Sequence, residues 1–302
     1  WEPQWFSEIE KFPSAVLDHH YPDVPNLGDM TEFKEWTNDP IDLLVGGTPC
    51  QSFSVAGLRK GLDDPRGNLM LTYLAIAERN KPRWLVWENV PGVLSSNRGR
   101  DFGTFLAALG EIGYGFAYRV LDAQYFGVAQ RRRRVFVVGY LGDWRRAAAV
   151  LFERESMSGH PAPSREAGQK AAPTVTQGAP FSRTGNERVE REAIAVAYDT
   201  TNITSPTNGS NPKIGDPVYT LASGQHPPLL TPQVRRLTPT ECERLQGFPD
   251  DYTQIPWRNK AAENCPDGPR YKAMGNSMAV PVMRWIGERI EMVEAHQMEN
   301  DQ

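Results

Sequence analysis

The sequence predicts an α/β protein with a smaller, irregular domain inserted into it. Short apolar runs alternate with segments of helical period over the first half of the 302 residues, a pattern typical of a parallel sheet covered by helices. Between about residues 153 and 232 the composition changes to mainly Gly, Pro, Ser, Thr and Asn. A last amphipathic helix is expected to pack back on the first half. We expect the larger domain to be a mixed-sheet α/β domain.

Three buried strands are predicted in the first half. They cover residues 41–45, 83–87 and 134–139. The first strand breaks into Gly46-Gly47-Thr48-Pro49, and the second ends in Glu88-Asn89. In an open parallel sheet, ligands bind outside the carboxyl ends of the strands, so both ends are candidate site positions.

Helices are predicted beside these strands and near the end of the chain. Residues 68–79 are apolar enough for a helix buried against the sheet, and residues 101–112 carry one apolar stripe. A capping box, with Pro239 between Thr238 and Glu241, starts another helix. The last helix is expected over residues 280–296.

These elements predict two domains. The larger comprises residues 1–150 and 268–302, and the smaller comprises residues 151–267. The smaller segment is either a flexible linker or an irregular domain of short strands and long loops, and its scattered apolar residues favour a domain.

The bulk composition restricts the function classes only loosely. The net charge is −4, but seven arginines stand against two acids between Arg119 and Arg146. That run is either a solvated surface or a face that contacts phosphates. No apolar run approaches a membrane span and no signal peptide is visible, so we expect a cytoplasmic protein without membrane contact.

The three cysteines do not form a recognisable framework. Cys50, Cys242 and Cys265 leave an odd thiol and no C-x-x-C spacing, which argues against disulfides or a zinc site. Cys50 follows a glycine-rich turn, where backbone N–H groups favour a thiolate. Glu88 ends the neighbouring strand. Taken singly, Cys50 could equally be a small buried thiol and Glu88 a surface acid.

Five segments in order resemble the motifs of cytosine-5 DNA methyltransferases of the bacterial and phage type. They are GGTPCQSFSVAG (46–57), ENVPGVL (88–94), QRRRRVFVVG (130–139), RRLTPTECERLQGFPDDY (235–252) and YKAMGNSMAVPV (271–282). The resemblance implies a Rossmann-like, S-adenosylmethionine-dependent methyltransferase domain. It also implies a target-recognition domain between the third and fourth motifs, where the composition changes.

The resemblance implies a role for each reactive residue. Cys50 would add to carbon 6 of cytosine, which makes carbon 5 nucleophilic enough to take a methyl group. Glu88 would hold the ring and give a proton to N3, which requires a raised pKa. Arg134 and Arg132 would contact the flipped base or its phosphate. Because the target atom is buried in the duplex, the base must be flipped out, and the loop from Gln51 to Asn68 would close over it.

The resemblance also implies the residues of the S-adenosylmethionine site. Glu8 matches the acid that binds the ribose, and Asp29 matches the residue near the adenine amine. Pro49, Asn276 and Ser277 match other positions that line the pocket. Taken singly, Glu8 and Asp29 could be surface acids, and residues 274–276 could be only a turn before the last helix.

One family motif has no counterpart in these 302 residues. The family opens with a strand and a Phe-x-Gly-x-Gly loop, which in nucleotide-binding folds precedes the ribose acid by roughly 20 residues. The loop would therefore precede Trp1. Three explanations stay open: the chain is trimmed, another polypeptide supplies the piece, or the protein is a degenerate relative. We expect the chain alone to bind the cofactor weakly.

The function predicted from these residues is methyl transfer from S-adenosylmethionine to carbon 5 of cytosine in a specific duplex DNA sequence. Two alternatives are a catalytically impaired DNA-binding remnant of the family and an RNA cytosine-5 methyltransferase. We expect a monomer that acts on double-stranded DNA at the nucleoid of a bacterial or phage-infected cell, with a cognate restriction enzyme as a candidate partner.

Overall fold

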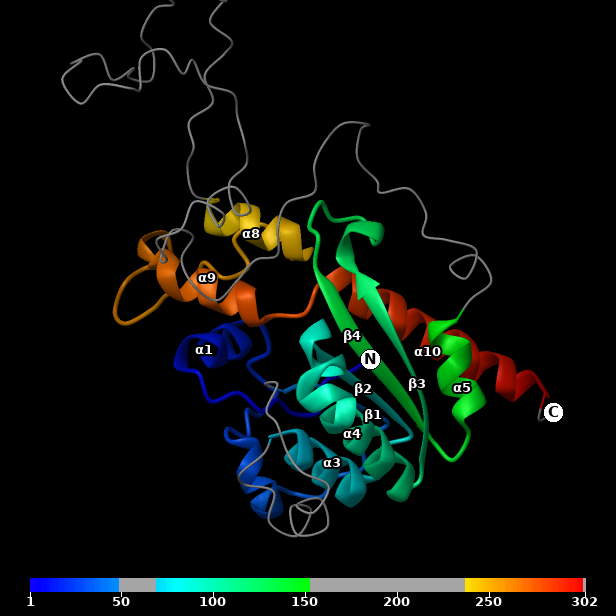
Figure 1. Cartoon of the computed structure of the whole chain (residues 1–302). Helices are drawn as coiled ribbons and strands as arrows, with labels where there is room; N and C mark the ends of the chain where they lie inside the picture. Colours follow the sequence, from blue (N-terminus) through cyan, green and yellow to red (C-terminus); the bar gives the residue numbers. More distant parts are fainter. Residues whose placement is uncertain (49–68, 153–236, 301–302) are drawn as a thin grey trace, which may run out of the picture.

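The computed structural model describes residues 1–48, 69–152 and 237–300, with side chains up to residue 296 (Figure 1). The predicted α/β class is confirmed: a four-stranded mixed sheet has helices on both faces. The predictions that fall on residues 49–68 and 153–236 lie outside the described residues. These include the loop over the flipped base and most of the expected recognition domain, so the domain boundaries stay a prediction.

The sheet has the strand order β1-β2-β4-β3. Its strands are β1 (Leu43–Gly47), β2 (Trp84–Asn89), β3 (Tyr114–Asp122) and β4 (Arg133–Leu141). β1 and β2 are parallel, whereas β4 is antiparallel to both of its neighbours. The parallel pattern expected for the first half therefore holds only for β1 and β2. The connection from β3 to β4 contains no crossover helix, and so the two strands pair antiparallel.

All three predicted strands are present, and β3 is an additional strand that the sequence analysis did not predict. The first strand also runs further than expected, through Gly46 and Gly47. The reason is tertiary: a Cβ atom on Gly46 would lie 2.8 Å from the ring of Tyr73. The Tyr73 hydroxyl donates to the carbonyls of Leu44 (3.3 Å) and Val86 (3.1 Å), so it sits against both β1 and β2. Glycine is needed here for this close approach rather than for a turn.

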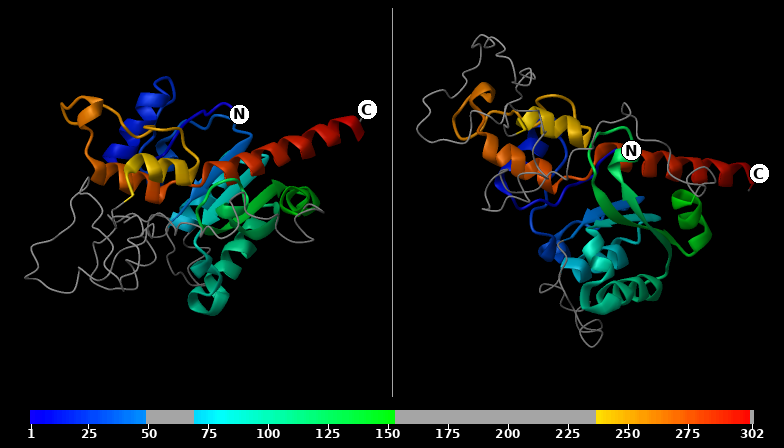
Figure 2. Two further views of the ribbon diagram at one scale, coloured as in Figure 1. Left: turned by 90° about the horizontal axis from the view of Figure 1, so that it is seen from above. Right: turned by 45° about the horizontal axis from the view of Figure 1, so that its top comes forward.

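Side chains of β2 alternate between two hydrophobic cores, one on each face of the sheet. Leu85 and Trp87 pack with α3 (Leu69–Asn80) and α4 (Arg100–Glu111). Trp84 and Val86 pack on the opposite face with α5 (Trp144–Leu151) and α10 (Val280–Asn300). The four helices thus lie in two layers, one on each side of the sheet (Figure 1). The predicted return of the last helix to the first half is confirmed, and Figure 2 shows α10 running out beyond the sheet.

Three further helices lie together beside the sheet (Figures 1 and 2). They are α1 (Lys11–His20), α8 (Pro239–Gln246) and α9 (Asp267–Asn276). The predicted capping box at the start of α8 is confirmed, with the Thr238 hydroxyl accepting from the Glu241 N–H and the Glu241 carboxylate accepting from the Thr238 N–H. Lys272 on α9 forms an ion pair of 2.7 Å with Glu10, which precedes α1. Short 3₁₀ turns cover Met30–Glu35, Pro91–Leu94, Ser96–Gly99, Ala123–Tyr125 and Ala262–Asn264.

The described chain exposes one edge of its sheet. β1 is an edge strand of the described sheet, and Val45 on it is 43% exposed. The outer backbone groups of β1 therefore have no strand partner within the described residues. Among those residues, no helix combines the length and the apolar character that crossing a membrane requires.

Candidate active site

Glu88 and Arg134 form a partly buried ion pair at the carboxyl end of β2. The Arg134 Nε lies 2.9 Å from the Glu88 Oε1, and the two side chains are 14% and 13% exposed. Glu88 stands opposite Gly47 on β1 and Phe136 on β4. Because alternate residues of a strand share a face, both charged side chains project on the same side as Phe136, the side covered by α10.

Burial sets the protonation of this pair. Desolvation raises the pKa of Glu88 above its ordinary value, although the nearby charges of Arg134 and Arg132 act in the opposite direction. Burial likewise lowers the pKa of Arg134, opposed by its contact with Glu88. The Glu88 carboxyl therefore keeps a proton to a higher pH than an exposed glutamate does.

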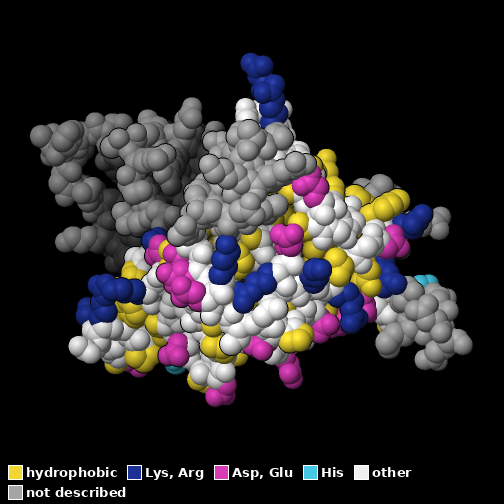
Figure 3. Space-filling model, turned by 90° about the horizontal axis from the view of Figure 1, so that it is seen from below, with side chains coloured by type: hydrophobic (Ala, Val, Ile, Leu, Met, Phe, Trp, Pro, Cys, Tyr) yellow, Lys and Arg dark blue, Asp and Glu magenta, His cyan; other side chains and the backbone are white. Residues whose placement is uncertain are grey.

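The arginine run 131–134 is divided between surface and interior. Arg131 and Arg133 are exposed, whereas Arg132 is buried and Arg134 is mostly buried. The sequence allowed two interpretations of this arginine run, a solvated surface or a face that contacts phosphates. Neither one describes all four side chains. On the molecular face in Figure 3, basic and acidic side chains are interspersed over the described part. A basic cleft between two lobes stays a prediction.

Arg132 contacts the backbone at the corner between α9 and α10 (residues 274–279, the α9–α10 corner). Its Nη2 donates to the carbonyls of Ser277 (2.7 Å) and Gly275 (3.3 Å), and Arg132 is only 4% exposed. Burial lowers its pKa to about 10. The backbone N–H of Arg132 donates to Asp122 (3.0 Å), which also accepts from Gln124. Sequence reasoning counted Asp122 only as a charge, although an acid at the end of a strand is a signal for such a role.

The chain that leads to Cys50 is held by two residues of β2. The Trp87 Nε1 donates to the Thr48 hydroxyl at 3.0 Å, and the Asn89 Nδ2 donates to the Thr48 carbonyl at 2.8 Å. Sequence reasoning did not assign a role to these contacts. Pro49 and Cys50 themselves lie outside the described residues, so the role of Cys50 as nucleophile stays a prediction.

Glu8 and Asp29 lie on two segments that run side by side. Phe6 and Asn26 form a parallel bridge, and the Asn26 side chain bonds both the N–H and the carbonyl of Glu8 at 2.9 Å. The Glu8 carboxylate also accepts from the Glu10 N–H, and Asp29 accepts from the Thr31 N–H. Both acids are thus held by the backbone at segment ends, in adjacent parts of the fold.

Asn276 and Ser277 lie at the end of α9, close to the Glu88 site. Residues 274–276 are the last helical residues rather than a free turn, and α10 begins at Val280. A Cβ atom on Gly47 would lie 3.2 Å from Met278 and 3.3 Å from the Glu88 Oε2. The α9–α10 corner, β1 and Glu88 therefore meet at one end of the sheet. The ion pair of Lys272 with Glu10 connects α9 to the segment that carries Glu8.

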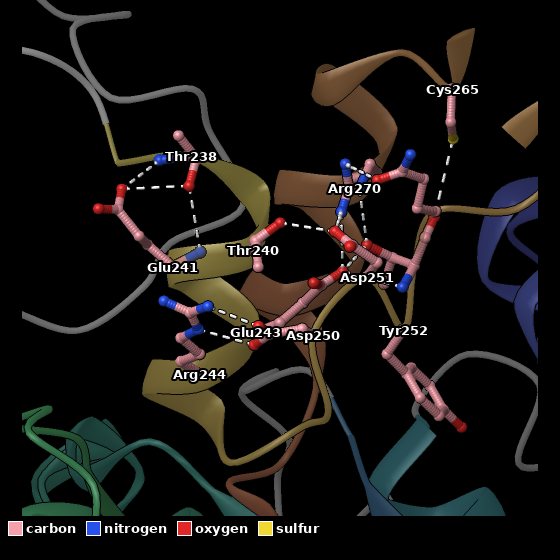
Figure 4. A network of polar contacts seen from close by, with 12 residues as sticks. Thr238, Thr240, Glu241, Glu243, Arg244, Asp250, Asp251, Tyr252, Cys265 and Arg270 are labelled. Atoms are coloured by element: carbon pink, nitrogen blue, oxygen red, sulfur yellow. Dashed lines mark hydrogen bonds and ion pairs between the residues drawn. The ribbon is translucent and has the colours of Figure 1, made fainter. Parts of the chain in front are cut away.

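A buried polar network fixes α8 against α9 (Figure 4). Glu243 is 0% exposed and accepts from the Thr253 N–H at 2.8 Å, from the Thr253 hydroxyl, and from Arg270 at 3.2 Å. Arg270 also donates to the Thr253 hydroxyl at 3.0 Å. These contacts hold the segment that follows residues 153–236 against the helix that ends at Asn276.

Replacing Arg270 by methionine is expected to lower the free energy of unfolding by about 3–5 kcal/mol, because Glu243 would stay buried without its counter-charge. Urea unfolding of the purified chain measures this. Arg244→Met is the matched control, since Arg244 pairs with Asp250 on the exposed side of α8, where solvent screens the pair and its loss should change the free energy of unfolding little. Equal losses in the two variants would contradict the assignment of the buried network.

Glu88 lies at the carboxyl end of β2, and the chain that leads to Cys50 leaves the carboxyl end of the parallel strand β1. This is the edge at which open α/β sheets bind their ligands, an arrangement typical of nucleotide-binding enzymes. Comparison with known proteins makes this specific. A sequence profile described as C-5 cytosine-specific DNA methylase matches residues 1–292, and the chain belongs to that family. Enzymes of this family use S-adenosylmethionine to methylate carbon 5 of cytosine in DNA.

Two curated relatives cover nearly the whole chain. A protein of Escherichia phage P1, named DNA N-6-adenine-methyltransferase, is 36% identical over 449 aligned positions, which include 99% of this chain and 59% of the phage protein. The Type II methyltransferase M.SsoII of Shigella sonnei is 32% identical over 94% of this chain and 72% of its own length. The chain thus spans between about three-fifths and three-quarters of these relatives.

A solved structure supports the fold. It is described as a DNA modification methyltransferase encoded within an E. coli prophage, and it aligns with a TM-score of 0.56 over 97% of this chain and 93% of its own. The sequences are 18% identical, so the likeness concerns the fold alone.

Proposed function

We propose that this protein transfers a methyl group from S-adenosylmethionine to carbon 5 of a flipped-out cytosine in a specific duplex DNA sequence. The observation that carries the proposal is the Glu88–Arg134 pair, 2.9 Å apart, at the carboxyl end of β2. It stands beside Gly47 on the strand that leads to Cys50. Family membership supports the reaction, whereas the residue roles rest on this geometry and on the motifs.

In the proposed reaction Cys50 adds its sulfur to carbon 6 of cytosine, and the Glu88 carboxyl gives a proton to N3 as negative charge develops on the ring. Carbon 5 forms a bond to the methyl group as the bond between that methyl group and the cofactor sulfur breaks, which leaves a neutral thioether. A solvent water molecule takes the proton from carbon 5, the Cys50–carbon 6 bond breaks with its electron pair returning to sulfur, and N3 returns its proton to Glu88. Arg134 orients Glu88 and stabilises its charged form after the first proton transfer.

The described residues fit S-adenosylmethionine. When bound, the cofactor supplies an electrophilic methyl group on a sulfonium. We propose that the Glu8 carboxylate holds its ribose hydroxyls and that Asp29 accepts from its adenine amine. Asn276 and Ser277 would line the same pocket from the α9–α10 corner. Pro49, which lies outside the described residues, is assigned to that pocket by its motif alone. The backbone contacts that fix both acids at segment ends support this assignment.

The remaining partners belong to the same proposal. Residues 151–267 would read the target sequence, and the protein would act as a monomer on double-stranded DNA in the cytoplasm of a bacterial or phage-infected cell, at the nucleoid. The Type II methyltransferases among the relatives make a cognate restriction enzyme a candidate partner. Its absence from the same genome would identify an orphan enzyme instead.

The test is transfer of labelled methyl from S-adenosylmethionine to unmethylated duplex DNA, followed by digestion to nucleosides and identification of the product. We expect 5-methylcytosine in duplex DNA and no comparable transfer to transfer RNA. DNA binding without transfer would favour the impaired remnant, and faster transfer to transfer RNA would favour the RNA enzyme.

One observation favours a second candidate, methylation of adenine at N6. The phage P1 relative carries that activity in its name. However, the chain covers only 59% of that protein, and the 449 aligned positions exceed the 302 residues of this chain, so the phage protein has insertions and further sequence that could supply the activity. The nucleoside digest separates the two, since N6-methyladenine in place of 5-methylcytosine would replace the first proposal by the second.

A further inference from the structure

We propose that Arg132 and Gln246 are positioning residues that together hold the α9–α10 corner in place beside Glu88. The inference deepens the proposed function, because Asn276 and Ser277 of this corner are the residues assigned to the cofactor. It also changes the role expected for Arg132, which the sequence placed against the flipped base.

The corner needs hydrogen-bond donors from outside α9. The last four carbonyls of a helix have no partner within it, and α9 ends at Asn276. Arg132 donates to the carbonyls of Gly275 and Ser277, and Gln246 donates to the carbonyls of Met274 (2.6 Å) and Ser277 (3.5 Å). A cation at the C-terminal end of a helix is also favoured by the helix dipole.

The two donors come from different parts of the chain. Arg132 precedes β4, and its backbone N–H is fixed by Asp122. Gln246 is the last residue of α8, the helix that follows residues 153–236. Both residues are almost fully buried, at 4% and 0% exposure. The corner is therefore held from the start of β4 on one side and from the end of α8 on the other.

The geometry also separates the two inward-facing arginines of the run. Arg134 faces the Glu88 carboxylate at 2.9 Å, whereas the Nη2 of Arg132 is directed at two backbone carbonyls. Arg132 still lowers the pKa of Glu88 through its charge, while its Nη2 donates to the two corner carbonyls. Arg132 thus acts through Asn276 and Ser277, and Arg134 acts on the acid.

Hydrogen exchange of the full chain without ligand tests the contacts directly. In Arg132→Met and in Gln246→Leu, we expect the backbone amides of the α9–α10 corner to exchange about tenfold faster or more, since a hydrogen bond to a charged or buried donor is lost. The amides of α3 should exchange as in the unchanged protein. Arg133→Met is the matched control, because Arg133 is next to Arg132 in the sequence but is exposed. This variant should leave the exchange rates of the corner amides unchanged.

Calorimetric titration and kinetics test the consequence. Gln246→Leu should raise the Kd and the KM for S-adenosylmethionine by about tenfold with little change in the KM for DNA, since only the cofactor side of the site is loosened. Arg132→Lys should restore part of the affinity lost in Arg132→Met. Because both residues hold the Ser277 carbonyl, the double variant should lose less than the product of the single losses.

Several results would overturn the proposal. One is unchanged exchange at the corner in both variants. Another is an equal increase at the corner and in α3 with a lower Tm, which would indicate a general structural role. If Arg132→Met does not fold, Gln246→Leu decides alone. If the protein without substitutions methylates no DNA, the proposed function is refuted. The hydrogen-exchange measurements would still decide whether Arg132 and Gln246 hold the corner.

Discussion

Replacing Cys50 by alanine is expected to lower the rate of methyl transfer to DNA by about 10⁴-fold or more, because losing the attacking nucleophile removes the covalent route as a whole. Without sulfur bonded to carbon 6, carbon 5 keeps its aromatic character and does not attack a sulfonium methyl group. Single-turnover transfer of labelled methyl, with enzyme in excess over DNA, measures the chemical step.

The other cysteines provide the control for this experiment. Cys242 is 2% exposed, and burial raises the pKa of its thiol to about 12, so it supplies almost no thiolate at neutral pH. Cys242→Ala should therefore keep its activity. DNA with 5-fluorocytosine at the target should form an adduct that survives denaturation, since fluorine cannot leave as a proton does. An adduct formed by Cys50→Ala would show that another residue is the nucleophile.

Replacing Glu88 by glutamine is expected to slow methyl transfer by about 10²- to 10⁴-fold, the range that a positioned acid contributes. Glutamine keeps the size of the side chain and its contacts with β1 and β4, but it cannot give a proton to N3. The single-turnover assay again reports the loss. Because Arg134 would then lose its ion-pair partner, the Tm is measured in parallel. A variant with unchanged Tm and unchanged rate would exclude Glu88 as the acid.

The pH dependence of kcat/KM should carry the signature of the same group. Burial raises the pKa of Glu88, and only the protonated carboxyl can act as the acid. The rate should therefore be highest below this pKa and fall as the pH rises through it. In Arg134→Gln a charge that lowers the pKa is removed, so the fall should move to higher pH. A shift to lower pH would contradict the assigned electrostatics, and Glu88→Gln should lose this limb altogether.

Much of the site was predicted from motifs because the chemistry restricts residue types at strand ends. Glu88 was predicted to hold the flipped base and Arg134 to contact that base or its phosphate, and the two side chains are found 2.9 Å apart. The roles of Trp87 and Asn89 in holding Thr48 were not predicted. Their signal in the sequence is the same as that of any buried strand residue, since a side-chain contact across strands depends on register and not on local pattern.

The sequence alone determined the α/β class, three strands, the capped start of α8 and the family, because apolar periodicity, capping residues and catalytic motifs are local properties. Only the tertiary structure decided the strand order with β4 antiparallel to both neighbours, the extension of β1 beneath Tyr73, and the division of the arginine run. Arg132 and Arg134 are equivalent residues in the chain, two positions apart. One meets helix-end carbonyls and the other a carboxylate because of the elements that pack around them, which no local pattern encodes.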